Sequence, residues 1–167
     1  MIGNDVIDLA LAKTQSNPKR KGFVDKLFTE QEQLMISKSM NPDLMIWNLW
    51  SRKEAAYKIY NRQTGIRAFI PKQLECADIE ITENVIIGTI SIDDYRYFTH
   101  TFIDDDFIHT IAVVNVEDFK RVMPVEREHI SKDIVGIPFH STTGNPISIS
   151  HHGRFEQTIV LDMDVES

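Results

Sequence analysis

Cysteine is almost absent from this chain of 167 residues, since Cys76 is the only one. A single cysteine excludes an internal disulfide and a metal cluster built from cysteines. Long apolar runs are also missing, because none reaches the roughly 20 residues that span a bilayer. The N-terminal sequence MIGNDVIDL lacks the basic start and the cleavage pattern of a signal peptide. We therefore expect a cytoplasmic protein without a membrane partner.

Two common catalytic signatures are absent as well. The chain has no G-x-S-x-G sequence, so the turn that presents the serine of many hydrolases is not indicated. It has no H-E-x-x-H sequence or other zinc spacing, which makes its histidines poor zinc candidates. The chain also has no internal repeat at a fixed period and no low-complexity segment. Candidate functional residues must therefore be sought in other clusters of polar side chains.

The composition is typical of a soluble globular protein, with 42% hydrophobic and 26% charged residues. That is enough apolar content for one domain over residues 1–167. The charge is uneven, because residues 1–72 carry a net charge of +5 and residues 73–167 carry −12. A basic first half favours an anionic ligand or partner there, although drift in composition would produce the same asymmetry. We expect no nucleic-acid partner.

The first half of the chain is predicted to be mainly helical after a short strand and turn at residues 1–9. The stretch SNPKRKG, residues 16–22, is predicted to be a loop because it contains Asn, Pro and Gly. A helix is predicted to follow Thr29 as N-cap, with Glu32 three residues later as a capping box requires. A second helix is predicted from about residue 43 to 61.

Two charged residues share a face of this second helix with large aromatic side chains. At spacings of three and four residues, that face carries Trp47, Trp50, Glu54 and Lys58. A helix that is apolar around much of its girth is largely buried. Glu54 and Lys58 are therefore expected at the edge of a packed region. Taken alone, however, an i,i+4 pair of this kind is most often a weak helix stabiliser of about 0.3–0.5 kcal/mol.

Beyond residue 65 the apolar pattern changes to the two-residue period of strands. Four segments predict an antiparallel meander, namely 76–83, 85–93, 95–104 and 107–116. Two shorter strands are predicted at 146–150 and 157–162, after an ambiguous stretch at 124–137 and a loop at 136–145. Helices grouped early and strands grouped late indicate an α+β fold, in which the early helices pack on a mainly antiparallel sheet.

Two aspartates near the N-terminus are candidates for chemistry. Asp5 ends an apolar segment, and Asp8 follows three residues later. Carboxylates in such a place are natural ligands for Mg²⁺, which prefers oxygen. An aspartate that simply caps or closes a turn would give the same pattern, and from this segment taken alone the cap or turn is the preferred interpretation.

The stretch SISHHGRF, residues 148–155, is another candidate. Ser148 and Ser150 alternate with isoleucines and therefore share one face of a strand. Histidines and an arginine follow in the turn. Hydroxyl, imidazole and guanidinium groups together suit a phosphate site, and a polar hairpin turn has the same composition.

In combination and order, these groupings resemble the motifs of the 4′-phosphopantetheinyl transferase superfamily. The G-x-D motif of that family corresponds to Gly3-Asn4-Asp5. Its W-[ST]-x-K-E-[AS]-x-x-K motif corresponds to Trp50 through Lys58, with Gly65 beyond it, and its S-[IL]-S-H segment corresponds to Ser148 through His151. The Ser-His segment comes last, as in the short holo-acyl-carrier-protein synthase type. Gly144-Asn145-Pro146 before it is similar to the longer, two-module type.

The resemblance implies both the fold of that family and its reaction. The phosphopantetheine arm of coenzyme A would move to a serine of an apo-carrier protein, with Mg²⁺ as cofactor and 3′,5′-ADP as product. Asp5 and Glu54 would hold the ion, and Lys58 would neutralise the leaving group. The base that takes the serine proton would be Glu54 or a metal-bound water. The residues implied to contact coenzyme A are His151, Ser150, Lys58, Arg62, Gly65 and Arg52.

Several further assignments stay open at this point. The loop 19–21, with Arg52, Lys53 and Arg62, supplies candidates for the 3′-phosphate or for an acidic carrier helix. A Mg²⁺-dependent phosphohydrolase and a non-catalytic module that binds coenzyme A or a carrier are alternative functions. The carrier itself, whether of fatty-acid biosynthesis or of polyketide or peptide assembly, is not indicated.

The oligomeric state is not indicated either, and a homo-oligomer is possible. Short-type relatives are trimers that share the site between subunits, whereas longer relatives build it within one chain.

Overall fold

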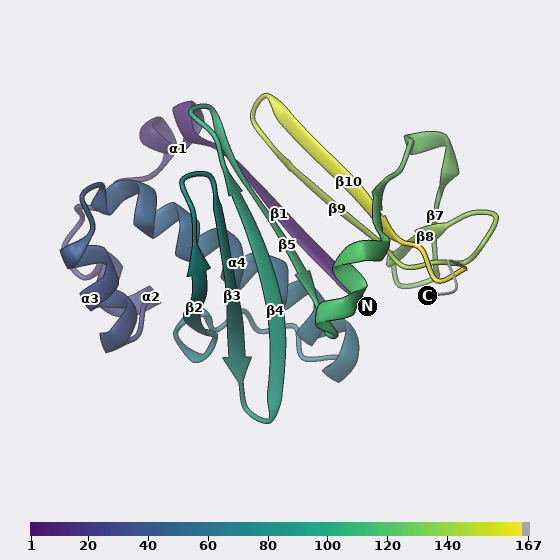
Figure 1. Ribbon diagram of the computed structural model, residues 1–167, viewed down its shortest axis with the longest axis horizontal. Helices are drawn as coiled ribbons and strands as arrows, with labels where there is room; N and C mark the ends of the chain where they lie inside the picture. The colour runs from purple at the N-terminus through teal and green to yellow at the C-terminus, as the bar shows by residue number, and fades with distance from the viewer. Residues whose placement is uncertain (165–167) are drawn as a thin grey trace.

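A five-stranded antiparallel sheet with the helices on one face forms the larger part of the molecule (Figure 1). The computed structural model describes residues 1–164. In spatial order, the strands are β1 (Ile2–Asp8), β5 (Phe107–Val113), β4 (Tyr95–Ile103), β3 (Val85–Ile92) and β2 (Glu75–Ile81). The predicted meander is confirmed, and the N-terminal strand completes one edge of the sheet by pairing with β5.

The helices are α1 (Leu9–Gln15), α2 (Phe23–Leu27), α3 (Glu30–Lys38) and α4 (Pro42–Thr64). The predicted capping box at the start of α3 is confirmed, since Thr29 and Glu32 each accept a hydrogen bond from the other's backbone N–H. The long helix α4 extends past the predicted end at 61, because Gly65 closes it in the left-handed region with φ of 74°. No helix in the described part of the chain is long and apolar enough to cross a membrane.

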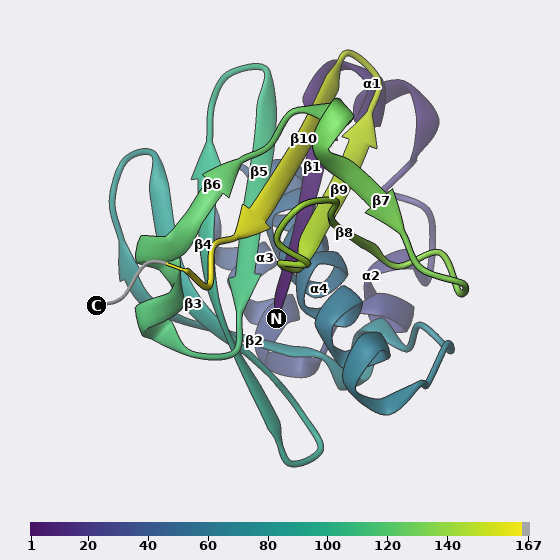
Figure 2. The same ribbon diagram turned by 90° about the vertical axis from the view of Figure 1, so that its right-hand side faces the viewer.

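Two smaller sheets form the C-terminal part of the molecule, next to β1 (Figure 2). One has the order β6 (Val122–Pro124), β10 (Phe155–Leu161) and β9 (Ile147–His152), and the other pairs β7 (Ile130–Lys132) with β8 (Pro138–His140). The two predicted C-terminal strands are confirmed as β9 and β10, whereas the predicted loop at 136–145 contains β8. Short 3₁₀ segments complete the chain, namely η1 (Pro71–Gln73), η2 (Val116–Arg121) and η3 (Arg127–His129).

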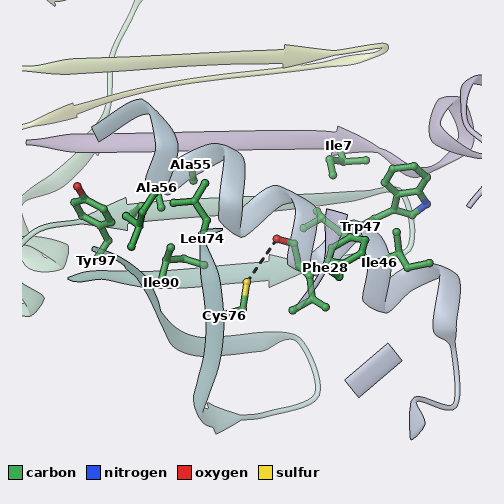
Figure 3. Close-up of a cluster of buried hydrophobic side chains, with 14 of the residues drawn as sticks. Ile7, Phe28, Ile46, Trp47, Ala55, Ala56, Leu74, Cys76, Ile90 and Tyr97 are labelled. Carbon is green, nitrogen blue, oxygen red and sulfur yellow. Dashed lines mark hydrogen bonds between the residues drawn. The ribbon is translucent and has the colours of Figure 1, made fainter. Parts of the chain in front are cut away.

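The main core lies between α4 and the five-stranded sheet (Figure 3). Ala55 and Ala56 on the helix are fully buried and bring it close to Ile90 and Tyr97 on the strands. Cys76 belongs to this core, where its thiol donates to the Leu49 carbonyl at 3.8 Å. Burial raises the pKa of this thiol to about 12, so Cys76 is a packing residue.

Candidate active site

The strand β1 lies directly against α4 because residue 3 is a glycine. A Cβ atom at Gly3 would lie 2.1 Å from the carbonyl oxygen of Ala55 and 3.3 Å from Cγ1 of Ile59. Glycine permits such a close approach of a strand to a helix backbone. The contact brings the segment of β1 that contains Asp5 next to the turn of α4 that contains Glu54.

Asp5 and Glu54 line the same cavity, which has a volume of about 380 Å³. We call it the carboxylate cavity. His151, near the end of β9, also lines it, together with Gln15 at the end of α1. The apolar part of the wall comes from β1, α1, α2 and α4, through Val6, Ile7, Ala12, Phe23, Leu27, Trp47 and Trp50. Three segments that are far apart in the sequence therefore bring polar groups to one place.

Both carboxylates are poorly solvated, and their charges repel each other. Burial raises the pKa of Asp5 to about 6, although the charge of Lys58 and two serine hydroxyls oppose this shift. Burial and the charge of Asp5 together raise the pKa of Glu54 to about 7. A pair of acids whose charged forms are both disfavoured is stabilised by a bound cation.

The donor atoms of this pair fit a hard divalent cation. Oδ1 of Asp5 accepts a hydrogen bond of 3.3 Å from the Ser150 hydroxyl, whereas Oδ2 is buried and has no partner among residues 1–164. No hydrogen bond contributes to the shifted pKa of Glu54. Mg²⁺ is commonly bound by one or two carboxylates, with water and substrate phosphates as its other ligands. Within residues 1–164, no group of three or more His, Cys, Asp or Glu side chains is placed to hold a metal ion. The chain would therefore supply two ligands, Asp5 and Glu54.

Lys58, one helical turn after Glu54, bridges two strands. Its ammonium group donates to the Asn4 carbonyl in β1 at 2.6 Å and to the Ile149 carbonyl in β9 at 2.9 Å. Burial lowers the pKa of Lys58, and the charges of Asp5 and Glu54 oppose this shift. An ammonium group has three N–H donors, so one donor of Lys58 is left for another acceptor.

Side chains of β9 close the outer edge of β1. Alternate backbone N–H groups of β1 donate to alternate side chains of β9 at 2.9–3.0 Å. The pairs are Asn4 with Ser148, Val6 with Ser150, and Asp8 with His152. An open strand edge would leave these groups available to another chain. The alternation predicted for Ser148 and Ser150 therefore places both against β1, where they hold the hairpin β9–β10 on the main sheet.

His151 and Ser150 occupy different environments. His151 is exposed, lines the carboxylate cavity and has no hydrogen bond within the described residues. Ser150 is buried, and its hydroxyl accepts from Val6 N–H and donates to Asp5. His151 is therefore the side chain that a ligand can reach, and Ser150 orients Asp5.

Asp8 connects the start of α1 to the β9–β10 turn. Its carboxylate accepts from the backbone N–H groups of Ala10 and Leu11 and so caps the helix. It also accepts from the backbone N–H, Nε and Nη2 of Arg154, which holds the pKa of Asp8 well below its usual range. A Cβ at Gly153 would lie 2.5 Å from this carboxylate. Of the two roles that the sequence left open for Asp8, the structure favours the cap.

Arg52 and Lys53 are placed away from the carboxylate cavity. Both side chains are fully buried. Arg52 pairs with Asp78 at 2.6 Å and donates to the Ala77 carbonyl at 2.8 Å. Lys53 pairs with Glu32 at 2.7 Å. Because internal partners engage both charges, we leave these two residues out of the candidate site.

Gly65 and Arg62 lie toward the C-terminal end of α4. Gly65 lines neither the carboxylate cavity nor the cavity at Arg62, and its left-handed conformation identifies it as the C-cap. Arg62 donates from Nη1 to the Ile2 carbonyl at 3.1 Å and, together with Lys58, lines a second cavity. Two of the residues predicted to contact coenzyme A, Lys58 and Arg62, are thus neighbours in space.

Asn4 anchors the C-terminal hairpin, and the sequence did not single out this role. Its side-chain amide accepts from the Ser148 hydroxyl at 2.7 Å and donates to the Gln157 carbonyl at 3.0 Å. It also lies 3.2 Å from Nε2 of His109. Burial lowers the pKa of His109 to about 4, so this imidazole is neutral at pH 7 and Nε2 can accept. The cluster forms only when distant strands meet, which is why no local pattern indicates it.

We expect Gly3→Ala to separate Asp5 from Glu54. The new methyl group cannot stay 2.1 Å from a backbone oxygen, so β1 and α4 must move apart. Overpacking of this kind costs about 1–3 kcal/mol. Urea denaturation should report a lower free energy of unfolding, and titration with Mn²⁺ should report weaker binding. If neither quantity changes, the close contact does not position the pair.

A family model described as the 4′-phosphopantetheinyl transferase superfamily matches residues 1–112, which is more than half of the chain. The match contains Asp5, Glu54 and Lys58, whereas β9 lies outside it. The chain belongs to the 4′-phosphopantetheinyl transferase superfamily, and phosphopantetheinyl transfer is the general activity that this membership supports.

Among solved structures, the chain is similar to the holo-(acyl-carrier-protein) synthase of Thermotoga maritima. The two share 18% sequence identity with a TM-score of 0.48, over 87% of this chain and 83% of that chain. No curated protein matches the sequence significantly. The predicted α+β class is confirmed by the arrangement of the helices and the antiparallel sheets.

Proposed function

We propose that this protein transfers the 4′-phosphopantetheine group from coenzyme A to a serine of an acyl or peptidyl carrier protein. The transfer is Mg²⁺-dependent and releases 3′,5′-ADP. The observation that carries this proposal is the meeting of Asp5 and Glu54 in one cavity, with His151 beside them. Membership of the superfamily supports the transfer, and the carboxylate pair supports its dependence on a divalent ion.

Asp5 and Glu54 would hold Mg²⁺, which when bound supplies positive charge to the pyrophosphate of coenzyme A. Ser150 orients Asp5 through its hydroxyl. Lys58 offers its remaining N–H to a phosphate oxygen and so stabilises the negative charge of the leaving group. His151 is the exposed donor at the rim of the cavity. Internal hydrogen bonds orient Asp5 and Lys58, whereas His151 has none within the described residues.

The proposed site is assembled from three elements of one chain. β1 supplies Asp5, α4 supplies Glu54 and Lys58, and β9 supplies His151. Because side chains of β9 already close the edge of β1, no second copy of the chain is needed to complete this group of residues. We therefore include no partner subunit in the proposed site.

Mass spectrometry of a carrier protein tests the proposal. An apo-carrier protein incubated with the chain, Mg²⁺ and coenzyme A should gain the mass of one phosphopantetheine group. The gain should disappear with EDTA or when the acceptor serine of the carrier is replaced by alanine. Release of free phosphopantetheine without modification of any carrier would indicate a phosphohydrolase. Tight binding of coenzyme A without turnover, across acyl and peptidyl carriers, would indicate a binding module.

A further inference from the structure

The turn of the hairpin β9–β10 lies beside α1 and is connected to both ends of that helix (Figure 2). At the first end, the backbone N–H of Asp8, the N-cap of α1, donates to Nδ1 of His152 at 2.9 Å. At the other end, Nε2 of His152 lies 3.1 Å from Oε1 of Gln15. Since Nδ1 accepts, Nε2 carries the proton that Gln15 accepts. One imidazole at the end of β9 therefore joins the turn to the whole helix.

Arg154 attaches the same turn to the carboxylate of Asp8. Its Nε donates to Oδ2 and its Nη2 donates to Oδ1, both at 3.0 Å, so each carboxylate oxygen receives one guanidinium donor. Paired contacts of this kind fix direction as well as distance. The Phe155 ring lies 5.0 Å from Cζ of Arg154, and Oδ1 of Asp106 lies 3.6 Å from Nη2. The guanidinium is therefore held by three groups, although 54% of the side chain is exposed.

The turn has no space for a side chain at Gly153. A Cβ atom there would lie 2.5 Å from Oδ2 of Asp8 and 2.9 Å from Cδ2 of Leu11. The φ angle of Gly153 is 54°, in the left-handed region that glycine adopts readily. Glycine therefore allows the turn to lie close enough to α1 for Arg154 to reach Asp8.

His151 depends on this attachment for its position. It lines the carboxylate cavity and has no hydrogen bond of its own within residues 1–164. Both of its neighbours are anchored to β1, since Ser150 accepts from the Val6 N–H and His152 accepts from the Asp8 N–H. The backbone on either side, and no contact of the imidazole itself, therefore determines where His151 lies.

The N-cap of α1 does not by itself require Arg154. The carboxylate of Asp8 accepts from the backbone N–H groups of Ala10 and Leu11, which is the contact that an N-cap makes. The guanidinium of Arg154 adds no hydrogen bond to the helix backbone. Its two contacts with Asp8 serve the turn, because they tie the turn to the start of the helix.

We propose that Arg154 is a positioning residue, which acts through Asp8 and the β9–β10 turn to hold His151 at the carboxylate cavity, within reach of the phosphates of coenzyme A. This inference rests on the proposed function, and adds to it the contact that keeps the exposed donor in place. Arg154 does not line the carboxylate cavity, so it acts through the turn and not by direct contact with a ligand there.

Calorimetric titration with coenzyme A tests this role in Arg154→Met. Asp8 keeps three backbone donors in this variant, from Ala10, Leu11 and residue 154, so the variant should fold. It should bind coenzyme A at least about tenfold more weakly, as expected when a hydrogen bond to a charged group is lost. Its affinity for Mn²⁺ should stay unchanged, because Asp5 and Glu54 lie outside the turn. A general collapse of the cavity would weaken both ligands and would overturn the proposal.

The same titration on His151→Ala and on the double variant separates positioning from a structural effect. If Arg154 acts through His151, Arg154→Met should cause no further loss once His151 is absent, so the two losses should not add. Additive losses would overturn the proposal, and so would an unchanged affinity in Arg154→Met. Arg154→Lys should recover part of the affinity, because an ammonium group can still pair with Asp8. A complete lack of recovery would exclude this pair as the cause.

Lys120→Met is the matched control, because Lys120 is an exposed cation of η2 that pairs with Glu117. This variant should bind coenzyme A like the parent. A loss equal to that of Arg154→Met would assign the effect to the removal of any positive charge and would overturn the positioning role.

Mass spectrometry of the carrier distinguishes a failure of this inference from a failure of the proposed function. Additive losses in a protein that modifies carriers would overturn only the role of Arg154. Losses that do not add, in a protein that binds coenzyme A but modifies no carrier, would support the role of Arg154 and refute the transfer. A protein that does not bind coenzyme A would overturn both.

Discussion

Glu54→Gln should abolish phosphopantetheine transfer and leave the fold intact. Glu54 shares the carboxylate cavity with Asp5, and its carboxylate has no hydrogen bond to lose within the described residues. The amide keeps the shape of the side chain but removes the negative charge that a cation requires. Replacing a residue that only supports a metal ligand lowers metal affinity or activity by about 10–100-fold. Replacing a direct ligand should therefore lower kcat/KM by at least about a hundredfold.

The free energy of unfolding should not fall in this variant at pH 8 without divalent metal. Burial and the charge of Asp5 raise the pKa of Glu54 from 4.5 to about 7, so the folded state disfavours its ionised form. The resulting destabilisation is fully present above pH 7 and disappears as the pH falls through 7 toward 4.5. Glu54→Gln should therefore be at least as stable as the parent protein at pH 8, and the difference should close at low pH.

Metal binding gives a readout of Glu54 that does not depend on the carrier protein. Titration with Mn²⁺, followed by electron paramagnetic resonance, should show a large loss of affinity in Glu54→Gln. The exposed Glu80 on β2 offers a matched control, and Glu80→Gln should bind the ion and transfer the group like the parent. Transfer at the parental rate by Glu54→Gln would remove Glu54 from the proposed metal site.

The sequence predicts the parts of this fold that local signals determine. The capping box at Thr29 and Glu32 and the alternating strands are signals of this kind, and all were confirmed. The helices α1 and α2 were not predicted, because they have only 7 and 5 residues. The aspartate that caps α1 looks like an ordinary turn residue until Arg154, from the distant hairpin, contacts it.

The motif pattern also predicts which residues meet, but not what each one contacts. Asp5 and Glu54 share a cavity as their order in the motifs implies. Arg52 and Lys53 directly precede Glu54 in the sequence, yet both side chains are fully buried against other partners. A lysine that lies three residues from a tryptophan gives no sign of a buried ion pair. The carboxylate that pairs with Lys53 belongs to Glu32 on α3, and only the packing of α3 on α4 brings the two side chains together.

Lys53→Met should destabilise the fold strongly, and by more than Gly3→Ala. The Lys53 ammonium pairs with Glu32 at 2.7 Å and donates to the carbonyls of Leu27 at 3.3 Å and Pro71 at 2.6 Å. The side chains of Lys53 and Glu32 are both 0% exposed. Removing one partner leaves the other charge buried and uncompensated, which costs about 3–5 kcal/mol. Urea denaturation of the variant should report a loss of this size.

A second substitution at Glu32 should recover much of this loss. In Lys53→Met/Glu32→Gln the buried charge is absent, and the amide oxygen can still accept from the backbone N–H of Cys76, which lies 2.9 Å from Glu32 Oε1. The capping-box hydrogen bond from the backbone N–H of Thr29 to Oε2 is lost, because the amide nitrogen cannot accept it, so the recovery should be incomplete. Replacing both members of a buried pair is often close to neutral, whereas replacing one is not. Lys38→Met, an exposed substitution on α3, is the matched control and should change stability by less than about 0.5 kcal/mol.

The position of Lys53 connects this stability test to the active site. Lys53 holds the Leu27 carbonyl at the end of α2, and the Leu27 side chain lines the carboxylate cavity. The single variant should therefore lose transfer activity through displacement of α2, and the double variant should regain part of it with its stability. If the free energy of unfolding of Lys53→Met stays within about 1 kcal/mol of the parent value, another group compensates the buried charge of Glu32. In that case the lysine of the W-[ST]-x-K-E motif would not be the residue that joins α2, α3 and α4.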